Sequence, residues 1–254
     1  MSSNKDSFGR TVIFILSVCI VCSIVVAGAA VGLKPLQTQN KLDDKQSKIL
    51  ETAGLLKEGM TKPEIRKLYS ERVEAKLISL DTGEYIEGDA EMFDERRESR
   101  DLTKSRKLEN DPAKISRRAD NAAVFLVKGD SGAIETVVLP MHGSGLWDLM
   151  FGFIGLEPDL NTVRNVIYSD HKETPGLGAE VLNPNWKALW PGKKIYNDAS
   201  EVEIQLVKGG AKATDVHGVD ALSGATLTSN GVTNTLHFWF GKEGYLPFIA
   251  KYRA

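Results

Sequence analysis

Hydrophobic residues form one unbroken run near the N-terminus and short alternating runs elsewhere. Residues 11–33, TVIFILSVCIVCSIVVAGAAVGL, include no formally charged side chain. A helix of this length spans a hydrocarbon core of about 30 Å. A secretory signal is the alternative, with small residues at 27–29 as its cleavage site, but signal cores are usually about 7–15 residues long. The run therefore predicts a retained membrane anchor over residues 11–33, preceded by a short tail over residues 1–10.

The anchor contains two short motifs. Gly28 and Gly32 have the GxxxG spacing that lets two membrane helices approach closely. Cys19 and Cys22 are the only cysteines of the chain. We interpret them as small apolar thiols, so the stability of the domain after the anchor must come from packing and not from disulfides.

Basic residues flank both ends of the anchor. Two lie before it and four follow closely: Lys5 and Arg10, then Lys34, Lys41, Lys45 and Lys48. The positive-inside rule gives no clear direction for such a distribution. Charge alone therefore leaves the orientation of the anchor open.

The pattern after the anchor predicts short helices mixed with hairpins. Residues 40–56 have helical spacing that ends at Gly54, and a capping box at Thr61 and Glu64 begins a second helix. Alternating apolar and polar residues predict strands in four segments. Two of these are hairpins, residues 73–86 with a turn at DTG and residues 122–140 with a turn at KGDSG. The other two are residues 162–169 and 202–209. This order predicts an α+β domain with an antiparallel sheet over residues 34–254.

One segment of this domain departs from the pattern. Residues 87–118 contain 18 charged residues of both signs and few apolar ones. We interpret it as a solvated insertion or an exposed helix rather than a binding surface. The chain as a whole has 26% charged residues and a formal charge of -2, which argues against general affinity for nucleic acid.

Three glycine-rich loops interrupt the predicted strands. They read HGSGLWDLMFGFIGL over residues 142–156, HKETPGLGAEV over residues 171–181 and DALSGATLTSNG over residues 220–231. Loops at strand ends can converge on one cleft, where flat backbone and apolar side chains would suit a planar ligand. None has Rossmann or Walker spacing.

Common catalytic and metal-binding patterns are missing from these loops. His142 and His171 each open a loop, but neither has a nearby third ligand at a familiar metal spacing. Ser223 beside Gly224 does not form a G-x-S-x-G elbow. We therefore expect no metal site and no catalytic side chain, and we interpret the other two histidines, at positions 217 and 237, as structural.

The third loop leads into a predicted helix that begins near Thr228 or Ser229. Its polar residues could form an N-cap, a phosphate cradle or an attachment site. Ser229 would suffice as the cap, which leaves Ser223 and Thr226 unexplained. The unpaired N–H groups and positive end of a helix favour a phosphate group there.

The three loops resemble the signatures of a known family. DALSGAT, residues 220–226, resembles the flavinylation motif D-x-x-[ST]-G-A-[TS], and ETPGLG and GSGLW, residues 173–178 and 143–147, resemble the other signatures of FMN-binding domains. Together with the single anchor, the chain resembles the C-subunit family of the sodium-translocating NADH:quinone reductases over nearly its whole length.

The resemblance implies a set of site residues. Thr226 would carry FMN as a phosphoester, attached from FAD by a flavin transferase with Mg²⁺. Transferase recognition would fall to Asp220, Ser223, Gly224 and Ala225. The noncovalent FMN contacts would come from residues in the three loops, namely Gly143, Ser144, Gly145, Leu146, Trp147, Glu173, Thr174, Gly176, Leu177, Ser223, Gly224 and Ala225. Lys208, at the end of a predicted strand, is an additional candidate as a charge partner of the reduced flavin or the phosphate.

The resemblance also implies a place in a membrane complex. Electrons would come from NADH through other subunits and an iron–sulfur centre, and this FMN would pass them to a flavin of the B subunit on the way to ubiquinone while sodium is pumped outward. The partners would be the A, B, D, E and F subunits. The anchor would cross the bacterial inner membrane once, with residues 1–10 cytoplasmic and residues 34–254 periplasmic. The chain alone would have no NADH:quinone reductase activity.

Two alternatives remain open from the sequence. One is the G subunit of an Rnf-type electron transport complex, which shares the FMN-binding domain. The other is a membrane-anchored assembly module whose glycine loops bind a partner and hold no flavin.

Overall fold

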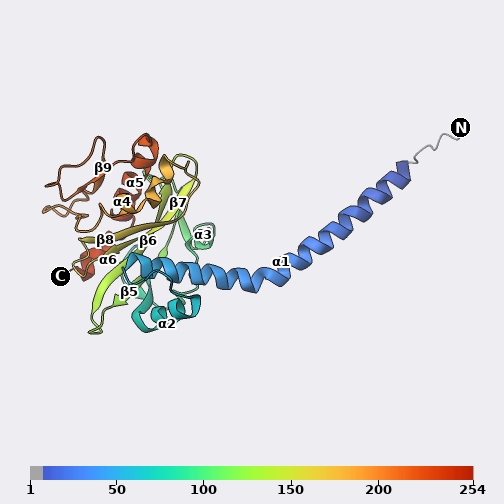
Figure 1. Ribbon diagram of the computed structural model, residues 1–254, viewed down its shortest axis with the longest axis horizontal. Helices are drawn as coiled ribbons and strands as arrows, with labels where there is room; N and C mark the ends of the chain where they lie inside the picture. The colour runs from blue at the N-terminus through green and yellow to red at the C-terminus, as the bar shows by residue number, and fades with distance from the viewer. Residues whose placement is uncertain (1–7, 254) are drawn as a thin grey trace. The chain divides into compact units, whose positions relative to one another are not determined.

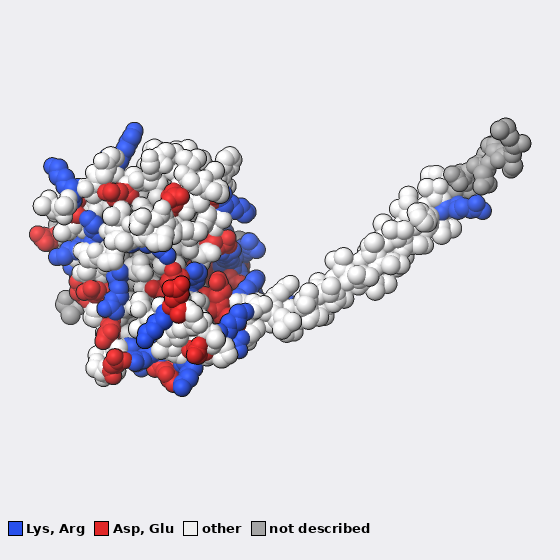
Figure 2. Space-filling view, viewed as in Figure 1, with Lys and Arg blue, Asp and Glu red and all other residues white. Residues whose placement is uncertain are grey.

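The apolar run near the N-terminus lies in one long helix, α1 (Phe8–Thr52), in a computed structural model that describes residues 8–253 (Figure 1). The chain divides into two units, of which the first ends at Asp44 and the second begins at Lys45. Within the first unit, α1 is long and apolar enough to cross a membrane, with a mean hydropathy of 2.9 over its most apolar window. Its middle part carries no Lys, Arg, Asp or Glu side chain (Figure 2).

The helix is longer than the sequence pattern indicates. The anchor and the amphipathic segment that ends near Gly54 were predicted as separate helices, but they are continuous and Pro35 lies inside α1. A proline inside a helix removes one main-chain donor, and its ring crowds the carbonyl group four residues earlier. Flanking residues with good helix propensity can nevertheless continue the helix through it.

The second unit is built on a six-stranded sheet in the order β2-β1-β5-β6-β7-β8, in which all neighbouring strands are antiparallel. Its strands are β1 (Val73–Ser79), β2 (Tyr85–Ile86), β5 (Asn121–Lys128), β6 (Ile134–Ser144), β7 (Leu149–Leu156) and β8 (Val163–Asp170). Both predicted hairpins are confirmed as β1–β2 and β5–β6. The α+β class with an antiparallel sheet is confirmed.

The sheet is buried on both faces. Successive side chains of a strand point to opposite sides of the sheet, so each face packs into a core of its own. In β5, Ala122, Val124 and Leu126 belong to the larger core, whereas Ala123, Phe125 and Val127 belong to the smaller one. The larger core includes α5 (Thr226–Trp239) and α6 (Leu246–Tyr252). The smaller core includes Ile49 and Leu50 of α1 together with α2 (Lys62–Arg72), whose predicted capping box at Thr61 is confirmed.

Short elements connect the sheet to α5. After β8 come the 3₁₀ helix η1 (Gly178–Leu182) and α4 (Pro184–Lys187). Strands β9 (Gln205–Val207) and β10 (Gly218–Asp220) then form a small parallel pair, and β10 leads directly into the loop before α5.

Most of the first glycine-rich stretch is sheet, so the prediction of one loop over residues 142–156 is wrong. Strand β6 continues to Ser144 and β7 begins at Leu149, which leaves a short turn between them. The glycines of β7 allow close approach: a Cβ on Gly152 would lie 2.6 Å from the carbonyl oxygen of Ile167 on β8. A nearly uniform apolar run is typical of a strand buried on both faces, and the glycines concealed that pattern.

The charged segment, residues 87–118, is only partly solvated. It forms α3 (Glu95–Glu98) and the antiparallel pair of β3 (Ser105–Lys107) with β4 (Arg117–Ala119). Arg118 has no exposed surface and donates hydrogen bonds to Asp81 and to the carbonyl oxygen of Glu243. Ion pairing and hydrogen bonding therefore anchor this segment to the domain, which composition alone did not indicate.

Candidate functional site

Glu173 joins all three signature loops. Its side chain is buried, and one carboxyl oxygen accepts hydrogen bonds from the backbone N–H groups of Leu146 (2.9 Å) and Trp147 (3.1 Å). The other oxygen accepts a hydrogen bond from the hydroxyl of Thr228 in the first turn of α5. The carboxyl group thus accepts hydrogen bonds from all three loops, and Glu173 positions the loops relative to one another.

Two glycines make room for this carboxyl group. A Cβ on Gly145 would lie 2.5 Å from one carboxyl oxygen of Glu173, and a Cβ on Gly178 would lie 2.3 Å from the other. Such distances are not compatible with any larger residue unless the carboxyl group moves. The glycines of the motifs GSGLW and ETPGLG therefore serve close packing around Glu173.

Exposed apolar side chains lie beside this junction. The side chain of Trp147 is 67% exposed and its indole N–H donates a hydrogen bond to the hydroxyl of Thr174 (3.1 Å). Leu177 is 42% exposed, and its Cδ2 atom would lie 3.0 Å from a Cβ on Gly224. The first, second and third loops thus meet at one place, as the sequence predicts, and they carry exposed apolar surface there.

The start of α5 differs from the prediction. The helix begins at Thr226, with Ala225 as the N-cap, so no side chain caps it. Ser229 was expected to be the cap but lies in the first turn. Its hydroxyl accepts a hydrogen bond from the backbone N–H of Leu222 and donates one to the carbonyl oxygen of Ala225, so it closes the loop from within.

The motif threonine, Thr226, is accessible. Thr226 and Ser223 are both exposed, whereas Ala225 is buried beneath them. Gly224 has a φ of +71°, a conformation that favours glycine and lets the chain turn into the helix. The first N–H groups of any helix have no partner inside the helix, and here no side chain supplies one. The geometry therefore offers an exposed hydroxyl beside an uncapped, electropositive helix end.

Asp220 and Lys208 lie at the two strands that lead to this loop. One carboxyl oxygen of Asp220 accepts a hydrogen bond from the backbone N–H of Ala211 (2.8 Å), and its backbone carbonyl accepts one from the indole of Trp186 (2.9 Å). Lys208 is exposed and directly follows β9, and the neighbouring Val207 pairs with Asp220. Asp220 thus has a structural role that its place in the motif does not reveal.

The other predicted site residues in the first two loops have roles in close packing and in turns. Gly143 lies in β6, where a Cβ would collide with the Thr235 side chain of α5. Ser144 ends β6 and its hydroxyl bonds to the carbonyl oxygen of Gly145 (3.0 Å). Gly176 is exposed with a φ of +75° in the turn before η1.

An exposed ion pair links the first two loops outside the glycines. Asp148 follows Trp147, Lys172 precedes Glu173, and their side chains form a salt bridge. The Lys172 ammonium group beside Asp148 holds the pKa of that carboxyl group below its usual value, and Asp148 raises the pKa of Lys172. At neutral pH both groups are therefore charged, and their pair is a solvent-screened contact between the two loops.

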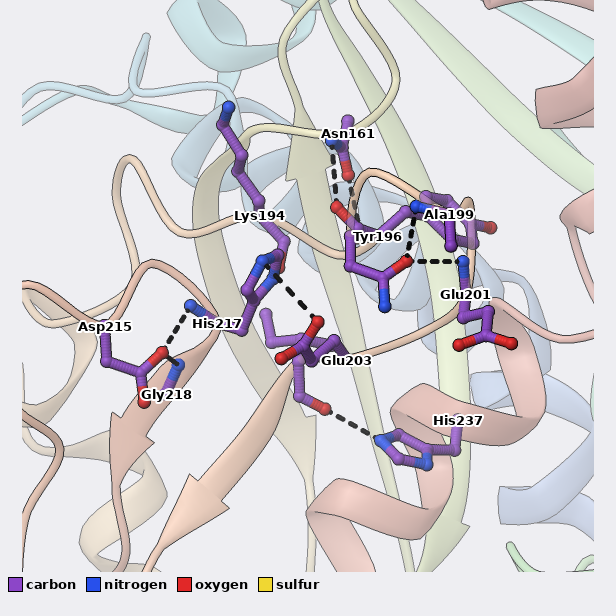
Figure 3. A network of polar contacts seen from close by, with 12 residues as sticks. Asn161, Lys194, Tyr196, Ala199, Glu201, Glu203, Asp215, His217, Gly218 and His237 are labelled. Atoms are coloured by element: carbon purple, nitrogen blue, oxygen red, sulfur yellow. Dashed lines mark hydrogen bonds and ion pairs between the residues drawn. The ribbon is translucent and has the colours of Figure 1, made fainter.

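Each of the four histidines either forms a hydrogen bond to a backbone group or is buried. His217 bonds to the carbonyl oxygen of Lys194 (2.8 Å) and His237 to that of Ile204 (2.9 Å), within a polar network shown in Figure 3. His171 accepts a hydrogen bond from the backbone N–H of Glu173, and His142 is buried. Over residues 8–253, no group of three His, Cys, Asp or Glu side chains is arranged to hold a metal ion.

Sequence reasoning missed the role of Thr228. Thr228 is buried and supplies the contact between α5 and Glu173. No local pattern indicated this role, because Glu173 lies 55 residues before Thr228 in the chain.

Comparison with known proteins agrees with this site. The family of FMN-binding domains matches residues 145–241, which include the turn before β7, the ETPGLG loop and the start of α5. The chain is 47% identical over 252 residues to the C subunit of the Na(+)-translocating NADH-quinone reductase of Yersinia pestis, covering 98% of this chain and 95% of the relative. It is 48% identical to the protein of the same name from Vibrio alginolyticus, covering 100% and 98% of the two chains.

Solved structures show the same fold. The crystal structure of Shewanella oneidensis NqrC has a TM-score of 0.80 with 41% identity and covers 84% of this chain and 98% of that one. A C-subunit structure from Parabacteroides distasonis has a TM-score of 0.68 with 30% identity, covering 85% and 96%. Fold and site therefore define an FMN-binding domain that follows a candidate membrane helix. Within that class, the chain belongs to the C-subunit family (NqrC) of the Na(+)-translocating NADH-quinone reductases, which favours this family over the G subunit of an Rnf-type complex.

Proposed function

We propose that this chain carries FMN as a phosphoester on Thr226 and relays electrons within a sodium-translocating NADH:quinone reductase. The observation that carries the proposal is the position of Thr226, an exposed hydroxyl at the first residue of α5 next to the alanine N-cap. Uncapped N–H groups and the positive end of the helix dipole stabilise a phosphate group at this place.

The residues of the site fit this cofactor. Apolar surface at Trp147 and Leu177 suits a flat ring system, and Gly224 leaves room beside the hydroxyl. FMN supplies the electron-transfer chemistry when bound, and the protein holds and orients it. Lys208 would balance negative charge, while Glu173 keeps the loops in place.

Attachment would depend on a flavin transferase. It would join the Thr226 hydroxyl oxygen to the phosphorus of FMN taken from FAD, with Mg²⁺ as its metal ion and with AMP as the leaving group. Asp220, Ser223, Gly224 and Ala225 would be the residues it recognises. A covalent tether keeps the effective concentration of the flavin high even where its noncovalent contacts are few.

The chain would act in the bacterial inner membrane. Residues 11–33 would cross the bilayer once, with residues 34–254 in the periplasm, where the transferase acts. Electrons would arrive from NADH through an iron–sulfur centre and leave towards the flavin of the B subunit and then ubiquinone, while sodium moves outward. The A, B, D, E and F subunits would be its partners. The long apolar helix and the names of the full-length relatives support this placement.

Thr226→Ala tests the proposal when the protein is produced together with the transferase. We expect intact-protein mass spectrometry to show the FMN increment in the wild type, in Thr226→Ser and in the control Thr214→Ala, which removes an exposed threonine outside the motif. The increment should be absent from Thr226→Ala. Covalent flavin in Thr226→Ala would refute the site, and a wild type without flavin would favour the assembly module.

A further inference from the structure

A cavity of about 650 Å³ lies between the charged segment, residues 87–118, and the sheet. The charged segment contributes residues of α3, of the turn that follows it and of the start of β4. The sheet contributes His142 of β6, Phe151 of β7 and Asp170 at the end of β8. Trp147 and Thr226 are not among the lining residues, so this cavity is distinct from the proposed flavin site.

The lining of this cavity has an excess of positive charge. Its basic residues outnumber its acidic ones, with Arg96, Arg100, Arg117 and Lys172 against Asp148 and Asp170. Both carboxylates are already paired, Asp170 with Arg96 (2.6 Å) and Asp148 with Lys172. Among residues 8–253, no carboxylate forms an ion pair with Arg100 or Arg117. Two guanidinium groups are therefore available to an anionic ligand.

Two of the arginines are held in place by contacts within the protein. The Arg96 guanidinium group lies 3.5 Å from the centre of the Phe151 ring. Arg117 donates hydrogen bonds from Nε to the hydroxyl of Ser105 (3.0 Å) and from Nη2 to the carbonyl oxygen of Ser105 (2.5 Å). A guanidinium group has five N–H donors, so the Nη1 group of Arg117 remains for a ligand. Side chains that are already ordered lose little conformational entropy when a ligand binds.

His142 adds a buried polar group without a hydrogen bond. Its residue is only 5% exposed, and its ring stacks on that of Phe151 with 5.1 Å between the ring centres. The Nδ1 atom lies 3.4 Å from Oε1 of Glu95, but neither atom has a hydrogen-bond partner among the described residues. Such buried groups cost free energy, which a bound ion can recover. An imidazolium ring donates from both nitrogens, so it can serve Glu95 and an anion in the cavity at the same time.

We propose that this cavity binds the dianion of a phosphate monoester, with Arg100 and Arg117 as its charge partners and protonated His142 as a further donor. A phosphate monoester carries a charge of about −2 at neutral pH, which matches the two guanidinium groups that have no carboxylate partner. The charge of the imidazolium ring is balanced by the neighbouring Glu95. A carboxylate has only one negative charge and would leave one arginine uncompensated.

The organic part of the ester has a place in the same cavity. Ile115, Leu149 and Phe151 supply apolar surface beside the arginines. The ester is either a soluble small molecule or the head group of phosphatidic acid, since both present the same phosphate group. This site gives the charged segment a binding role that its mixed composition did not indicate, and it does not depend on a flavin at Thr226.

The test uses the full-length protein in detergent, with phenyl phosphate as the probe and phenyl sulfate, a monoanion of similar shape, as the control ligand. Isothermal titration calorimetry compares the wild type with Arg100→Gln and with the control Arg97→Gln. Both arginines are exposed, but Arg97 does not line the cavity. The Arg100 side chain makes no hydrogen bond among the described residues, so its loss should leave the fold intact. The ¹⁵N resonances of the imidazole rings report contact at His142, because the chain has only four histidines.

We expect Arg100→Gln to bind phenyl phosphate about tenfold more weakly than the wild type, as for the loss of a hydrogen bond between charged groups, and Arg97→Gln to match the wild type. Phenyl sulfate should bind the wild type about tenfold more weakly than phenyl phosphate. Bound phenyl phosphate should move the ring nitrogens of His142 towards the resonances of an imidazolium. Any one of four results would overturn the inference: no binding of phenyl phosphate, equal affinities of the two arginine variants, equal affinities for phosphate and sulfate, or unchanged His142 resonances.

A second arm of the experiment identifies the source of the phosphate group. The calorimetric titration is repeated in nanodiscs of phosphatidylcholine with and without phosphatidic acid. A lower apparent affinity for phenyl phosphate when phosphatidic acid is present assigns the site to the lipid head group, because the lipid then competes for the cavity. An equal affinity in both nanodiscs assigns it to a soluble ester, and either result upholds the site.

Discussion

Replacing Glu173 by alanine should loosen all three signature loops at once. The substitution removes the acceptor of two backbone N–H bonds, at 2.9 and 3.1 Å, and of the Thr228 hydroxyl. Each hydrogen bond to a charged group contributes about 1.5 kcal/mol at the lower end of the usual range. Water can reach part of the gap, because Leu146 and Trp147 are exposed. We therefore expect a loss of about 3 kcal/mol in the free energy of unfolding.

Glu173→Gln provides a finer comparison. Its amide oxygen can still accept both N–H bonds, and its NH₂ group can donate to a rotated Thr228 hydroxyl, so the loss should be about 1 kcal/mol. For a domain of this size about 1 kcal/mol corresponds to roughly 2–4 °C in Tm. The alanine variant should thus melt about 10 °C below the wild type and the glutamine variant about 3 °C below it.

Thermal unfolding of flavin-free protein, followed by near-UV circular dichroism, measures these differences without any contribution from a cofactor. Glu201→Ala is the matched control, because this glutamate is exposed and its side chain has no partner among the described residues. It should stay within about 0.5 kcal/mol of the wild type. An alanine variant at Glu173 that is as stable as this control would show that the carboxyl group does not hold the loops.

Three further predictions follow from the same contacts. Gly178→Ala should lower the free energy of unfolding by about 2 kcal/mol in urea titrations, because the new methyl group would collide with the Glu173 carboxyl group; an unchanged midpoint would mean that the carboxyl group can move aside. Burial raises the pKa of Glu51, but hydrogen bonds from two lysine side chains outweigh it, so the pKa lies below 4.5. Its stabilisation should be complete above pH 4.5 and decline as the pH falls below that value, and Glu51→Gln should flatten this part of the stability profile; equal slopes for both proteins would refute the assignment. Trp147→Ala and Leu177→Ala should change the absorption spectrum of the flavin while the covalent mass increment stays, and unchanged spectra in both would place the ring elsewhere.

The sequence predicted most elements for which local signals were strong. Alternating apolar residues with turn residues between them located both hairpins, and the capping box at Thr61 located α2. The three loops were also predicted to meet, since each follows a strand. Strand β7 was missed because its glycines resemble a loop in isolation, whereas their reason is the close approach of β8.

Contacts between distant residues could not be predicted in this way. The motif glutamate, Glu173, was predicted as a cofactor contact, and the sequence did not indicate its hydrogen-bond partners, which lie 26 residues before it at Trp147 and 55 residues after it at Thr228. The burial of Arg118 likewise depends on Asp81 and on a carbonyl group near the C-terminus. Such long-range hydrogen bonds leave no periodic trace in the sequence.

The single carboxyl group at Glu173 has a consequence for how this family can change over evolutionary time. Three loops that share one set of hydrogen bonds cannot gain or lose residues independently, because an insertion in any of them would pull its N–H or hydroxyl group away from the shared acceptor. Insertions and deletions should therefore accumulate in segments that make no hydrogen bond to Glu173, such as the tip of the β5–β6 hairpin and the exposed parts of residues 87–118. The number of residues within each of the three signature loops should stay constant.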